Sequence, residues 1–358
     1  STSKVMINRL MLDNERIENI AKSVEDIVKL SDPVGRVLYE TKRPNGLIIN
    51  RVSVPLGVIG IIYESRPNVT VDASVLCIKA GNVAILRGGS ESFNSNTSLI
   101  KAIQLALTKN DLNKDTIQLV ETVDRAAVDY MLAEMTDTID VIVPRGGKGL
   151  VKKVQDMARV PIIGHLEGIC HIYVNNSANL ETALKIIHNA KLRRTEICGA
   201  VETLLIDQAY AKDNLNKIVT NLHEGGCEIR GDIASQEIDN RILHANEVDW
   251  STEYLDAIIA IKLVKNVDEA VEHIAEYGSG HTESIIAEDK EVAEKFLNLV
   301  DSAIVMHNTS TQFADGGEFG LGAEIGISTG RLHARGPVGL EGLTTYKYIV
   351  KGNGQIRP

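Results

Sequence analysis

The sequence predicts an α/β protein built on parallel β-sheets. Short apolar segments of strand length alternate with segments of helical periodicity along most of the 358 residues. Continuous apolar strands that alternate with helices indicate a parallel sheet covered by helices on both faces. At roughly 100 to 200 residues per domain, a chain of this length is expected to form two or three domains.

The first predicted element is an amphipathic helix that ends before Asp32-Pro33. Its apolar stripe has spacings of three and four residues and consists of Ile17, Ile20, Val24, Ile27 and Leu30. Asp13 is the expected N-cap of this helix. Two strand segments follow at 47–53 and 56–63, separated by Pro55. Apolar and polar residues alternate more strongly in the first segment, as in an edge or half-buried strand.

The rest of the chain alternates between the two kinds of element. Helices are predicted at 69–80, 92–107, 124–134, 148–158, 180–192, 215–223, 267–276 and 290–299. Strands are predicted at 83–86, 116–120, 139–143, 171–174, 203–206, 257–264, 283–287, 303–307 and 344–350. The segment 312–342 contains nine glycines, so we expect irregular loops there that approach a ligand closely.

Composition excludes several classes of function. Hydrophobic residues make up 44% and charged residues 24%, which is typical of a globular protein. The net charge of −10 argues against general nucleic-acid binding, although a local basic pocket for a phosphorylated small molecule stays open. No apolar run reaches the roughly 20 residues that span a bilayer, and no secretory signal is evident, so no membrane partner is expected. The four cysteines include no CxxC pair, which predicts a reducing, cytoplasmic location.

Two glycine-containing turns follow predicted strands and carry basic residues. The segment 143–150 (VPRGGKGL) joins a strand to a helix, where backbone N–H groups and the helix N-terminus favour a phosphate. Arg145 and Lys148 would reinforce that binding. The spacing matches neither G-x-G-x-x-G nor the Walker motif, and a tight turn with solvated basic residues is the alternative. Arg87, in the second turn at 86–90, could pair with a phosphate or could simply be a surface arginine.

Cys198 is the candidate nucleophile among the four cysteines. It follows Arg193 and Arg194 and precedes a strand, with Gly199 beside it. Positive neighbours raise the ionised fraction of a thiol, whereas a buried structural cysteine is the alternative. Cys77, Cys170 and Cys227 are interpreted as structural.

His165, Cys170 and His171 form a loose cluster in the sequence. A zinc site needs a third and a fourth ligand at suitable spacing, and none is evident near them. We therefore expect no metal site, and interpret the histidines as satisfied side chains around a strand start.

Several of these segments together resemble the γ-glutamyl phosphate reductases of the aldehyde dehydrogenase superfamily. The segments are 63–70 (YESRPNVT), 142–147 (IVPRGG), 164–174 (GHLEGICHIYV), 198–205 (CGAVETLL), 319–324 (FGLGAE) and 333–337 (HARGP). The resemblance runs in order from about residue 5 to the C-terminus, and members of the family carry a further helical segment before it.

The resemblance implies an aldehyde dehydrogenase-like fold with two parallel-sheet α/β domains and a small β oligomerisation element. The cofactor-binding domain is expected at 1–167 and the catalytic domain at 168–309, and 310–343 returns to the cofactor domain. The strand at 47–53 and the segment 344–358 would form the oligomerisation element, so a homo-oligomer is expected.

The implied reaction is the second step of proline biosynthesis. γ-Glutamyl phosphate and NADPH give glutamate-5-semialdehyde, phosphate and NADP, and a functional link to glutamate 5-kinase is implied as well. Cys198 matches the family's nucleophile, which expels phosphate and leaves a thioester for hydride reduction. Asn68 matches the side chain that holds the oxyanion. His165 takes the position of the glutamate base of oxidising members, and Glu167 is displaced from it by two residues.

Further residues match cofactor and substrate positions of the family. The cofactor-binding candidates are Arg87 near the adenosine ribose, Gly146 and Gly147 near the pyrophosphate, and Glu253 at the nicotinamide ribose. Ser310 and Thr311 match a site that grips a glutamate-type carboxylate. Arg66, Arg331 and Arg335 are further candidates for phosphate or carboxylate.

Two alternatives to this function stay open. A water-dependent aldehyde dehydrogenase would turn over without phosphate and would depend on Glu167. A non-catalytic nucleotide-binding scaffold of the same fold would bind the reduced cofactor without turnover.

Overall fold

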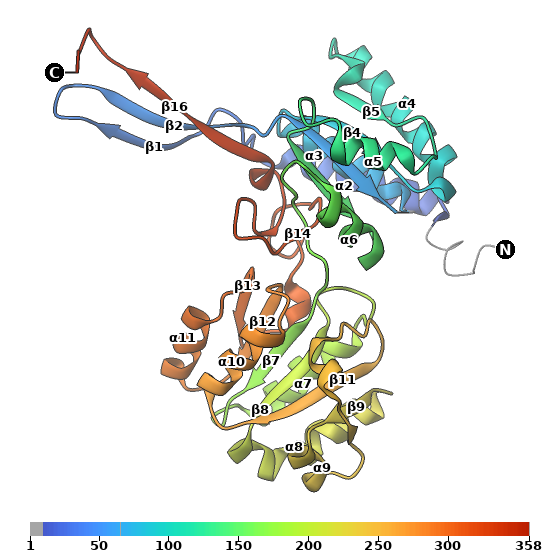
Figure 1. The fold of residues 1–358 in the computed structure, drawn as a ribbon, viewed down its shortest axis with the longest axis vertical. Coiled ribbons are helices and arrows are strands. Elements are labelled where there is room, and N and C mark those ends of the chain that lie inside the picture. The colour runs from blue at the N-terminus through green and yellow to red at the C-terminus, as the bar shows by residue number, and fades with distance from the viewer. Residues whose placement is uncertain (1–9, 65, 358) are drawn as a thin grey trace. The chain divides into compact units, whose positions relative to one another are not determined.

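Two units, each built on its own parallel sheet, make up the chain (Figure 1). A computed structural model describes residues 10–64 and 66–357, so Ser65, within the segment 63–70, lies outside the described residues. Unit 1 consists of the residues up to Gly164 together with those from Gly320 onward, and unit 2 consists of His165–Phe319. The assignment of the cofactor to one domain and of catalysis to the other remains a prediction.

The central sheet of unit 1 has four parallel strands in the order β5-β4-β3-β6. These strands are β3 Val58–Tyr63, β4 Val83–Arg87, β5 Ile117–Leu119 and β6 Val141–Arg145. Their parallel pairing confirms the prediction made from the alternation of strands and helices. Both edge strands follow connections that contain a helix, as parallel pairing requires.

Helices cover both faces of this sheet. One face packs against α2 (Asn14–Lys29), α3 (Pro67–Lys79) and α4 (Phe93–Lys109), and the other against α5 (Ala126–Ala133) and α6 (Lys148–Met157). Side chains of β3 alternate between the two cores, with Ile59 and Ile61 in the first and Ile62 in the second. Because both faces are covered, the strand reads as a continuous apolar run in the sequence.

The first helix, α2, begins and ends where the sequence predicts. The side chain of Asp13 accepts a hydrogen bond from the backbone N–H of Arg16 at 2.9 Å, as an N-cap does. Of the predicted stripe, only Ile27 is fully buried, whereas Ile17 is 49% exposed. The stripe therefore contacts the core through its C-terminal half.

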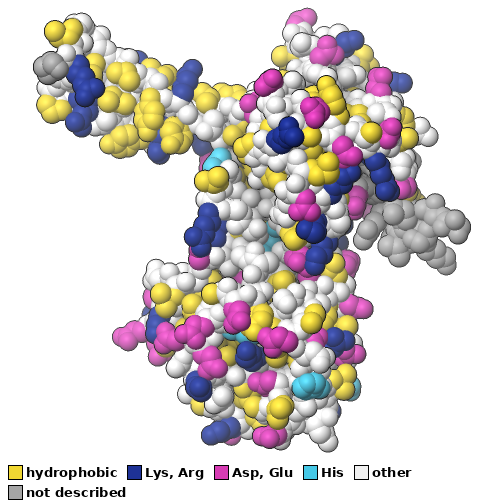
Figure 2. All heavy atoms as spheres, in the orientation of Figure 1, with side chains coloured by type: hydrophobic (Ala, Val, Ile, Leu, Met, Phe, Trp, Pro, Cys, Tyr) yellow, Lys and Arg dark blue, Asp and Glu magenta, His cyan; other side chains and the backbone are white. Residues whose placement is uncertain are grey.

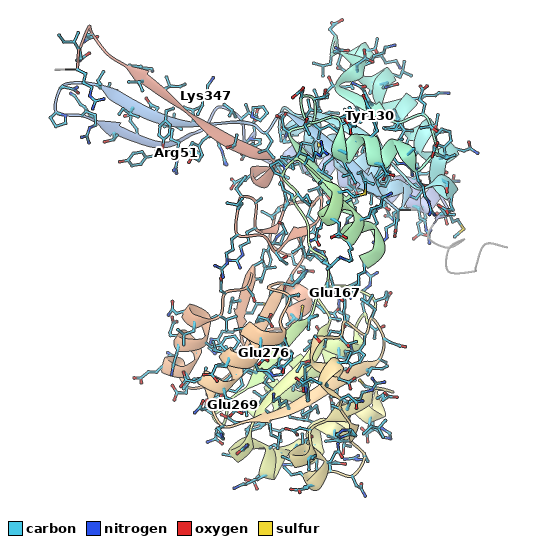
Figure 3. All side chains as sticks on the ribbon, viewed as in Figure 1. Arg51, Tyr130, Glu167, Glu269, Glu276 and Lys347 are labelled. Atoms are coloured by element: carbon cyan, nitrogen blue, oxygen red, sulfur yellow. The ribbon has the colours of Figure 1, made fainter. Side chains whose placement is uncertain are left out.

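A separate antiparallel sheet in unit 1 joins the two ends of the chain's described part. It has the order β1-β2-β16, with β1 at Val37–Lys42, β2 at Ile48–Pro55 and β16 at Thr344–Lys351. Arg51 of β2 lies over the ring of Tyr346 of β16 at 4.7 Å, and Figure 3 labels Arg51 and Lys347 on these paired strands. Of the two alternatives for residues 47–53, the half-buried strand is confirmed, because β2 mixes buried and partly buried residues. The edge position is not, because an unexpected strand, β1, pairs on the other side of β2.

Unit 2 contains a seven-stranded parallel sheet in the order β10-β9-β11-β8-β7-β12-β13. Its strands are β7 Cys170–Val174, β8 Val201–Asp207, β9 Glu228–Gly231, β10 Leu243–His244, β11 Ile258–Val264, β12 Thr282–Ile286 and β13 Ile304–His307. Its helices are α7 Leu180–Leu192, α8 Gln208–Glu224, α9 Ile233–Ile238, α10 Val267–Tyr277 and α11 Lys290–Leu299. The strands β9 and β10 and the helix α9 were not predicted.

The helices of unit 2 form two layers around its sheet. Residues of α7 and α8 pack with Ile172 and Leu204 in one core, and residues of α10 and α11 pack with Tyr173 and Leu205 in the other. Adjacent residues of β7 and β8 thus enter opposite layers, as the two-residue period of a strand requires.

Among the described residues, no helix is long and apolar enough to cross a membrane.

The glycine-rich segment has little regular structure, as predicted. It contains the end of the short helix η4 (Thr311–Phe313), the two-residue strands β14 (Ile327–Ser328) and β15 (Gly336–Pro337), and the short helix η5 (Glu341–Leu343). The strands β14 and β15 pair with each other in antiparallel fashion. The remaining short helices of the chain are η1 Ser90–Ser92, η2 Lys114–Thr116 and η3 Glu247–Ser251.

Candidate active site

Cys198 lies in unit 2, on the loop that leads from α7 into β8. It is half-buried, whereas the thiols of Cys77, Cys170 and Cys227 are buried. The backbone N–H of Ala200 donates to the carbonyl of Ile197 at 3.0 Å, which closes a tight turn around Cys198. This thiol is therefore the one of the four that the fold leaves partly accessible.

Gly168 fixes the backbone of this loop by close contact. A Cβ atom at residue 168 would lie 2.1 Å from the carbonyl oxygen of Cys198 and 2.7 Å from its Cα, so only glycine fits there. Gly199 meets a milder restriction on the other side of the loop, because its Cβ would lie 3.2 Å from the carbonyl oxygen of Thr311. The loop at 193–200 is called the nucleophile loop after the predicted role of Cys198. It is packed between residue 168 and residue 311.

The segment that carries Ser310 and Thr311 is tied to the same loop. The side-chain amide of Gln312 donates to the carbonyls of Ala190 at 2.8 Å and Arg194 at 3.1 Å. Thr311 is fully buried, and its hydroxyl oxygen has no hydrogen-bond partner. Both predicted substrate residues therefore lie beside the nucleophile loop.

Glu253 holds the other side of Gly168. Its carboxylate accepts a hydrogen bond from the backbone N–H of Gly168 at 2.9 Å. The loop with Glu253 is held in turn by Glu202 of β8, whose carboxylate accepts from the N–H of Leu255 at 3.5 Å. This gives Glu253 a local role in positioning the nucleophile loop, which its sequence match did not suggest.

A buried ion pair closes the base of the nucleophile loop. Lys191, at the end of α7, lies 2.6 Å from Glu202 of β8, and both side chains are fully buried. Burial raises the pKa of Glu202 to about 7, and the charge of Lys191 opposes that rise. Neither residue was singled out from the sequence, because a Lys and a Glu eleven positions apart carry no motif.

Two histidines lie beside Cys198. Ligand atoms of His165, Cys198 and His281 all lie within 4.8 Å of one another, and the two imidazole rings stand edge to face with centroids 4.8 Å apart. Burial, together with the neighbouring His165, lowers the pKa of His281 to about 3, so this side chain is neutral. The sequence pointed to His165 but missed His281, which lies more than 100 residues away along the chain.

Cys170 and His171, from the loose sequence cluster with His165, make separate contacts in the structure, and the thiol of Cys170 also lies 3.7 Å from Nδ1 of His281. The ring of His171 is fully buried and its Nδ1 lies 3.0 Å from the carboxylate of Glu283, which also accepts the backbone N–H of His171. The thiol of Cys170 donates to the carbonyl of Cys198 at 3.1 Å, and burial holds the pKa of Cys170 well above its usual value. Both residues therefore have structural roles.

In unit 1, the turn between β6 and α6 binds a carboxylate of the chain itself. Gly147 is the N-cap of α6, and its backbone N–H donates to Glu64 at 2.9 Å. A Cβ at Gly146 would lie 2.7 Å from the carboxyl carbon of Glu64. A carboxylate of the chain, that of Glu64, therefore occupies the helix N-terminus where the sequence predicts a phosphate, and phosphate binding stays a prediction.

Arg87, at the end of β4, is buried rather than on the surface. Its guanidinium donates to the backbone carbonyls of Gly88, Val123 and Asp124. It is 8% exposed, and its Nε has no hydrogen-bond partner. The reading of Arg87 as a surface arginine was therefore wrong.

Asn68 lies in the first turn of α3, where it is exposed. Its side-chain amide donates to Asp72 at 3.4 Å. Burial raises the pKa of Asp72, whereas the hydrogen bonds from Ser23 and Asn68 and the charge of Arg145 lower it. Asp72 therefore links Asn68 to the basic residue of the β6–α6 turn.

The three further arginine candidates are all exposed. Arg66 directly precedes α3, while Arg331 and Arg335 lie in the loop that joins β14 to β15. Their positions in the fold do not select one of the three as an anion-binding residue.

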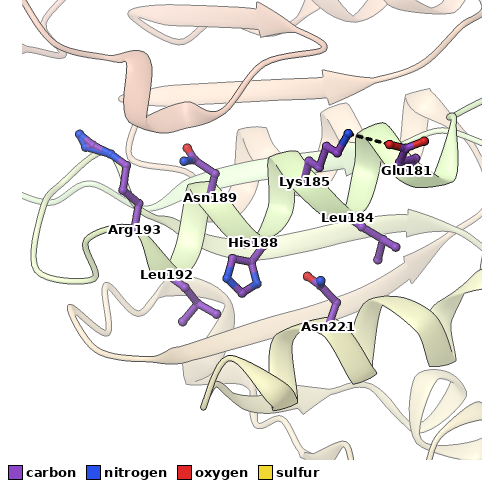
Figure 4. Close-up of a pocket in the computed structure, with 8 residues that line it drawn as sticks. All are labelled: Glu181, Leu184, Lys185, His188, Asn189, Leu192, Arg193 and Asn221. Atoms are coloured by element: carbon purple, nitrogen blue, oxygen red, sulfur yellow. Dashed lines mark hydrogen bonds and ion pairs between the residues drawn. The ribbon is translucent and has the colours of Figure 1, made fainter.

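A cavity of about 630 Å³ lies on the outer side of α7, and Figure 4 shows the residues that line it. They come from α7, its C-terminal end and α8: Glu181, Leu184, Lys185, His188, Asn189, Leu192, Arg193 and Asn221. None of the candidate catalytic, cofactor or substrate residues is among them. The cavity is therefore not part of the site described here.

Comparison with known proteins gives concordant matches from a family model and from individual relatives. The model of the aldehyde dehydrogenase family matches residues 14–227. The γ-glutamyl phosphate reductase of Paramagnetospirillum magneticum is 60% identical over 99% of this chain and 84% of its own length. That of Parvibaculum lavamentivorans is 57% identical over 100% and 84%.

Solved structures agree with these relatives. The crystal structure of γ-glutamyl phosphate reductase from Thermotoga maritima superposes with a TM-score of 0.97 at 47% identity, covering 99% of this chain and 86% of that one. An acetylating aldehyde dehydrogenase from Geobacillus thermoglucosidasius has a TM-score of 0.69 at 20% identity, over 99% and 88% of the two chains. The second comparison shows the fold alone.

Proposed function

The chain belongs to the γ-glutamyl phosphate reductases, within the aldehyde dehydrogenase family, and on that premise we propose that it forms a thioester on Cys198 and reduces it with NADPH. The chain is an oxidoreductase of proline biosynthesis, and it converts γ-glutamyl phosphate to glutamate-5-semialdehyde and phosphate. The observation that carries the proposed mechanism is the partly accessible thiol of Cys198 on a loop held by Gly168 and Gln312.

The chemistry requires a positioned thiol. A carboxylate resists hydride attack because it is already anionic, whereas its acyl phosphate has a good leaving group. The sulfur of Cys198 attacks the acyl carbon, and the C–O bond to phosphate breaks with its electron pair. A nicotinamide cofactor, when bound, would supply the hydride that reduces the thioester to a thiohemiacetal. Collapse of the thiohemiacetal releases the aldehyde and the thiolate.

Asn68 is proposed to donate to the oxygen that carries negative charge at both tetrahedral stages. Loss of one such donor costs about 10²- to 10³-fold in rate. The exposed amide of Asn68 makes a long hydrogen bond of 3.4 Å to Asp72, so it can exchange this partner at small cost.

Water must be kept from the thioester, because hydrolysis would waste the phosphorylated substrate. His165, rather than a carboxylate, stands beside Cys198. Glu167 lies half-buried on the loop that leads into β7 (Figure 3), and we propose no catalytic role for it. The alternative of a water-dependent aldehyde dehydrogenase depends on Glu167 as the base.

The residues of unit 1 fit a phosphorylated dinucleotide. Gly146 and Gly147 would hold its pyrophosphate at the N-terminus of α6, in exchange for the carboxylate of Glu64. Arg87 would pair with the 2′-phosphate of NADP through the donors that its carbonyl partners leave free. Glu253 is proposed for the nicotinamide ribose.

The substrate's charged ends need donors as well. Ser310 and Thr311 are proposed for its carboxylate, since the backbone of Thr311 packs against Gly199 and its hydroxyl has no hydrogen-bond partner. Arg66, Arg331 and Arg335 are proposed for phosphate or carboxylate. The acyl phosphate must come from a kinase, so a functional link to glutamate 5-kinase follows from the substrate's chemistry.

The β1-β2-β16 sheet is proposed to mediate a homo-oligomer. Figure 2 shows hydrophobic side chains along this sheet. Its exposed apolar residues are Val37, Leu38, Tyr39, Tyr346, Tyr348 and Val350. An exposed apolar surface of this kind is typical of an interface. Light scattering with a Tyr348→Lys variant tests this proposal, and an unchanged oligomer would contradict it.

The function is tested by reverse turnover of glutamate-5-semialdehyde with NADP, with and without phosphate. We expect phosphate-dependent turnover that Cys198→Ala abolishes and Cys77→Ala largely keeps. Turnover without phosphate that Glu167→Gln abolishes would favour the water-dependent alternative. Cofactor binding with no turnover in the wild-type chain would favour the non-catalytic scaffold.

A further inference from the structure

Unit 2 brings together three side chains whose donor atoms all bind borderline-soft metal ions. His165 and Cys198 come from the loops before β7 and β8, and His281 precedes β12 directly. Their ligand atoms lie within 4.8 Å of one another. Two imidazoles and a thiolate are a donor set that selects Zn²⁺ over the hard cations Mg²⁺ and Ca²⁺.

The environment of His281 is that of a metal ligand. Its Nδ1 lies 2.9 Å from the hydroxyl oxygen of Thr282, to which it can donate. Its Nε2 is buried and has no hydrogen-bond partner. A ligating histidine commonly donates its other ring N–H to a neighbour, which fixes the tautomer and leaves a lone pair for the metal. An unpartnered buried ring nitrogen otherwise costs free energy, so a ligand for it is to be expected.

The distances permit tetrahedral coordination after small movements. With Zn–S of about 2.3 Å and Zn–N of about 2.0 Å, the ligand atoms of a zinc site stand roughly 3.3–3.8 Å apart. Atoms that already lie within 4.8 Å of one another need to approach by at most about 1.5 Å. Cys198 and His165 are half-buried, so their side chains have room for that movement.

We propose that His165, Cys198 and His281 form a reversible, inhibitory Zn²⁺ site, with water as the fourth ligand. On binding, the thiol of Cys198 releases its proton to solvent and its sulfur coordinates the ion. The coordinated sulfur is no longer available to attack an acyl carbon. The inhibitory part rests on the proposed function of Cys198, whereas the binding itself does not.

Binding is measured with Co²⁺, which takes the place of Zn²⁺ and reports a thiolate ligand by a charge-transfer band. Chelator-treated full-length chain is titrated with Co²⁺, and the band is then displaced by Zn²⁺. We expect one ion per chain for the wild type. Cys198→Ser should lose the band, because it removes the thiolate. Both Cys198→Ser and His281→Gln should weaken metal binding by more than about tenfold, because loss of even an outer partner costs about 10- to 100-fold.

Two matched controls separate the site from other thiols and imidazoles. Cys227→Ser and His188→Gln change the same residue types elsewhere in unit 2, and both should keep the band. Circular dichroism establishes that each variant is folded, and because the two test variants lie in different segments, misfolding of one leaves the other informative. A band that persists in folded Cys198→Ser, or a wild-type chain without stoichiometric binding, would overturn the proposal.

Turnover gives the second readout. Substoichiometric to stoichiometric Zn²⁺ should inhibit the wild type, and a chelator should restore activity. A chain that binds Co²⁺ through Cys198 but never turns over γ-glutamyl phosphate would keep the metal site and contradict the proposed function. A chain that turns over normally with Zn²⁺ bound would overturn the inhibitory role.

Discussion

Gly168→Ala should displace the nucleophile without changing any reacting group. In the structure, a Cβ at residue 168 would lie 2.1 Å from the carbonyl oxygen of Cys198, and that distance must increase to at least 3.0 Å. The backbone of Cys198 therefore has to move by the difference, 0.9 Å. A misplacement of about 1 Å costs on the order of 100-fold in rate, which corresponds to about 2.7 kcal/mol of transition-state stabilisation.

The assay combines two measurements on the same protein. Turnover of glutamate-5-semialdehyde gives kcat, and alkylation by iodoacetamide gives the accessibility of the Cys198 thiol without any cofactor. Gly199→Ala provides a milder comparison, because its Cβ would lie 3.2 Å from the carbonyl oxygen of Thr311. That carbonyl needs to move by only a few tenths of an ångström, so kcat should fall less than in Gly168→Ala. Gly149→Ala is the control, since its Cβ meets no atom within 4 Å, and the alkylation rate of Cys198 should be unchanged. Wild-type kcat in folded Gly168→Ala would refute the idea that this contact positions the nucleophile.

Four further variants, and a fifth as a control, test the site and the stability of the fold around it. Glu64→Gln removes the carboxylate from the N-terminus of α6, so NADPH should bind roughly two- to fivefold more tightly in a fluorescence titration. Unchanged affinity would show that the Glu64 carboxylate and the cofactor's pyrophosphate do not compete for this position. Arg87→Met should weaken NADPH binding by roughly tenfold or more and NADH binding much less. Equal losses of affinity for the two cofactors would show that Arg87 acts only by holding the 123–124 loop and does not recognise the 2′-phosphate. Lys191→Met leaves a buried carboxylate unpaired and should cost about 3–5 kcal/mol of unfolding free energy in urea. Lys185→Met is the control, because it breaks an exposed ion pair and should leave the unfolding free energy nearly unchanged. Burial lowers the pKa of His273 to about 2, so the unfolded chain takes up a proton below pH of about 6.5 that the folded chain refuses. His273→Gln should therefore reduce the loss of stability between pH 7.5 and 5.0 by about 2 kcal/mol, and an identical pH dependence in wild type and variant would contradict this assignment.

Much of the fold could be predicted because its strands are buried on both faces. Such strands are continuous apolar runs, and the helices between them keep a period near 3.6 residues. The strand β1 was missed because all but one of its six residues are exposed, so no apolar pattern marks it. The strand β10 has only two residues, both exposed, and no pattern is readable in so short a segment.

The site could be predicted in part, for the same physical reason. The glycine turn at 146–147 and the cysteine at 198 are local features, so residue type and neighbours indicate them. His281 and Glu64 act through contacts with residues far along the chain, and only the topology brings them there. The buried position of Arg87 likewise depends on the loop at 123–124, which lies 36 and 37 residues away.

The nucleophile loop shows why these long-range contacts matter more to the mechanism than the motif around Cys198. Lys191 and Glu202 pair on either side of the loop and close its base. Gln312 holds the carbonyls at the start of the loop, and Gly168 packs against the carbonyl of Cys198. All of these contacts restrain the backbone or the ends of the loop, and Cys198 itself stays half-buried. Because they all lie in unit 2, loosening any one of them should lower kcat and leave the binding of NADPH to the α6 turn unchanged.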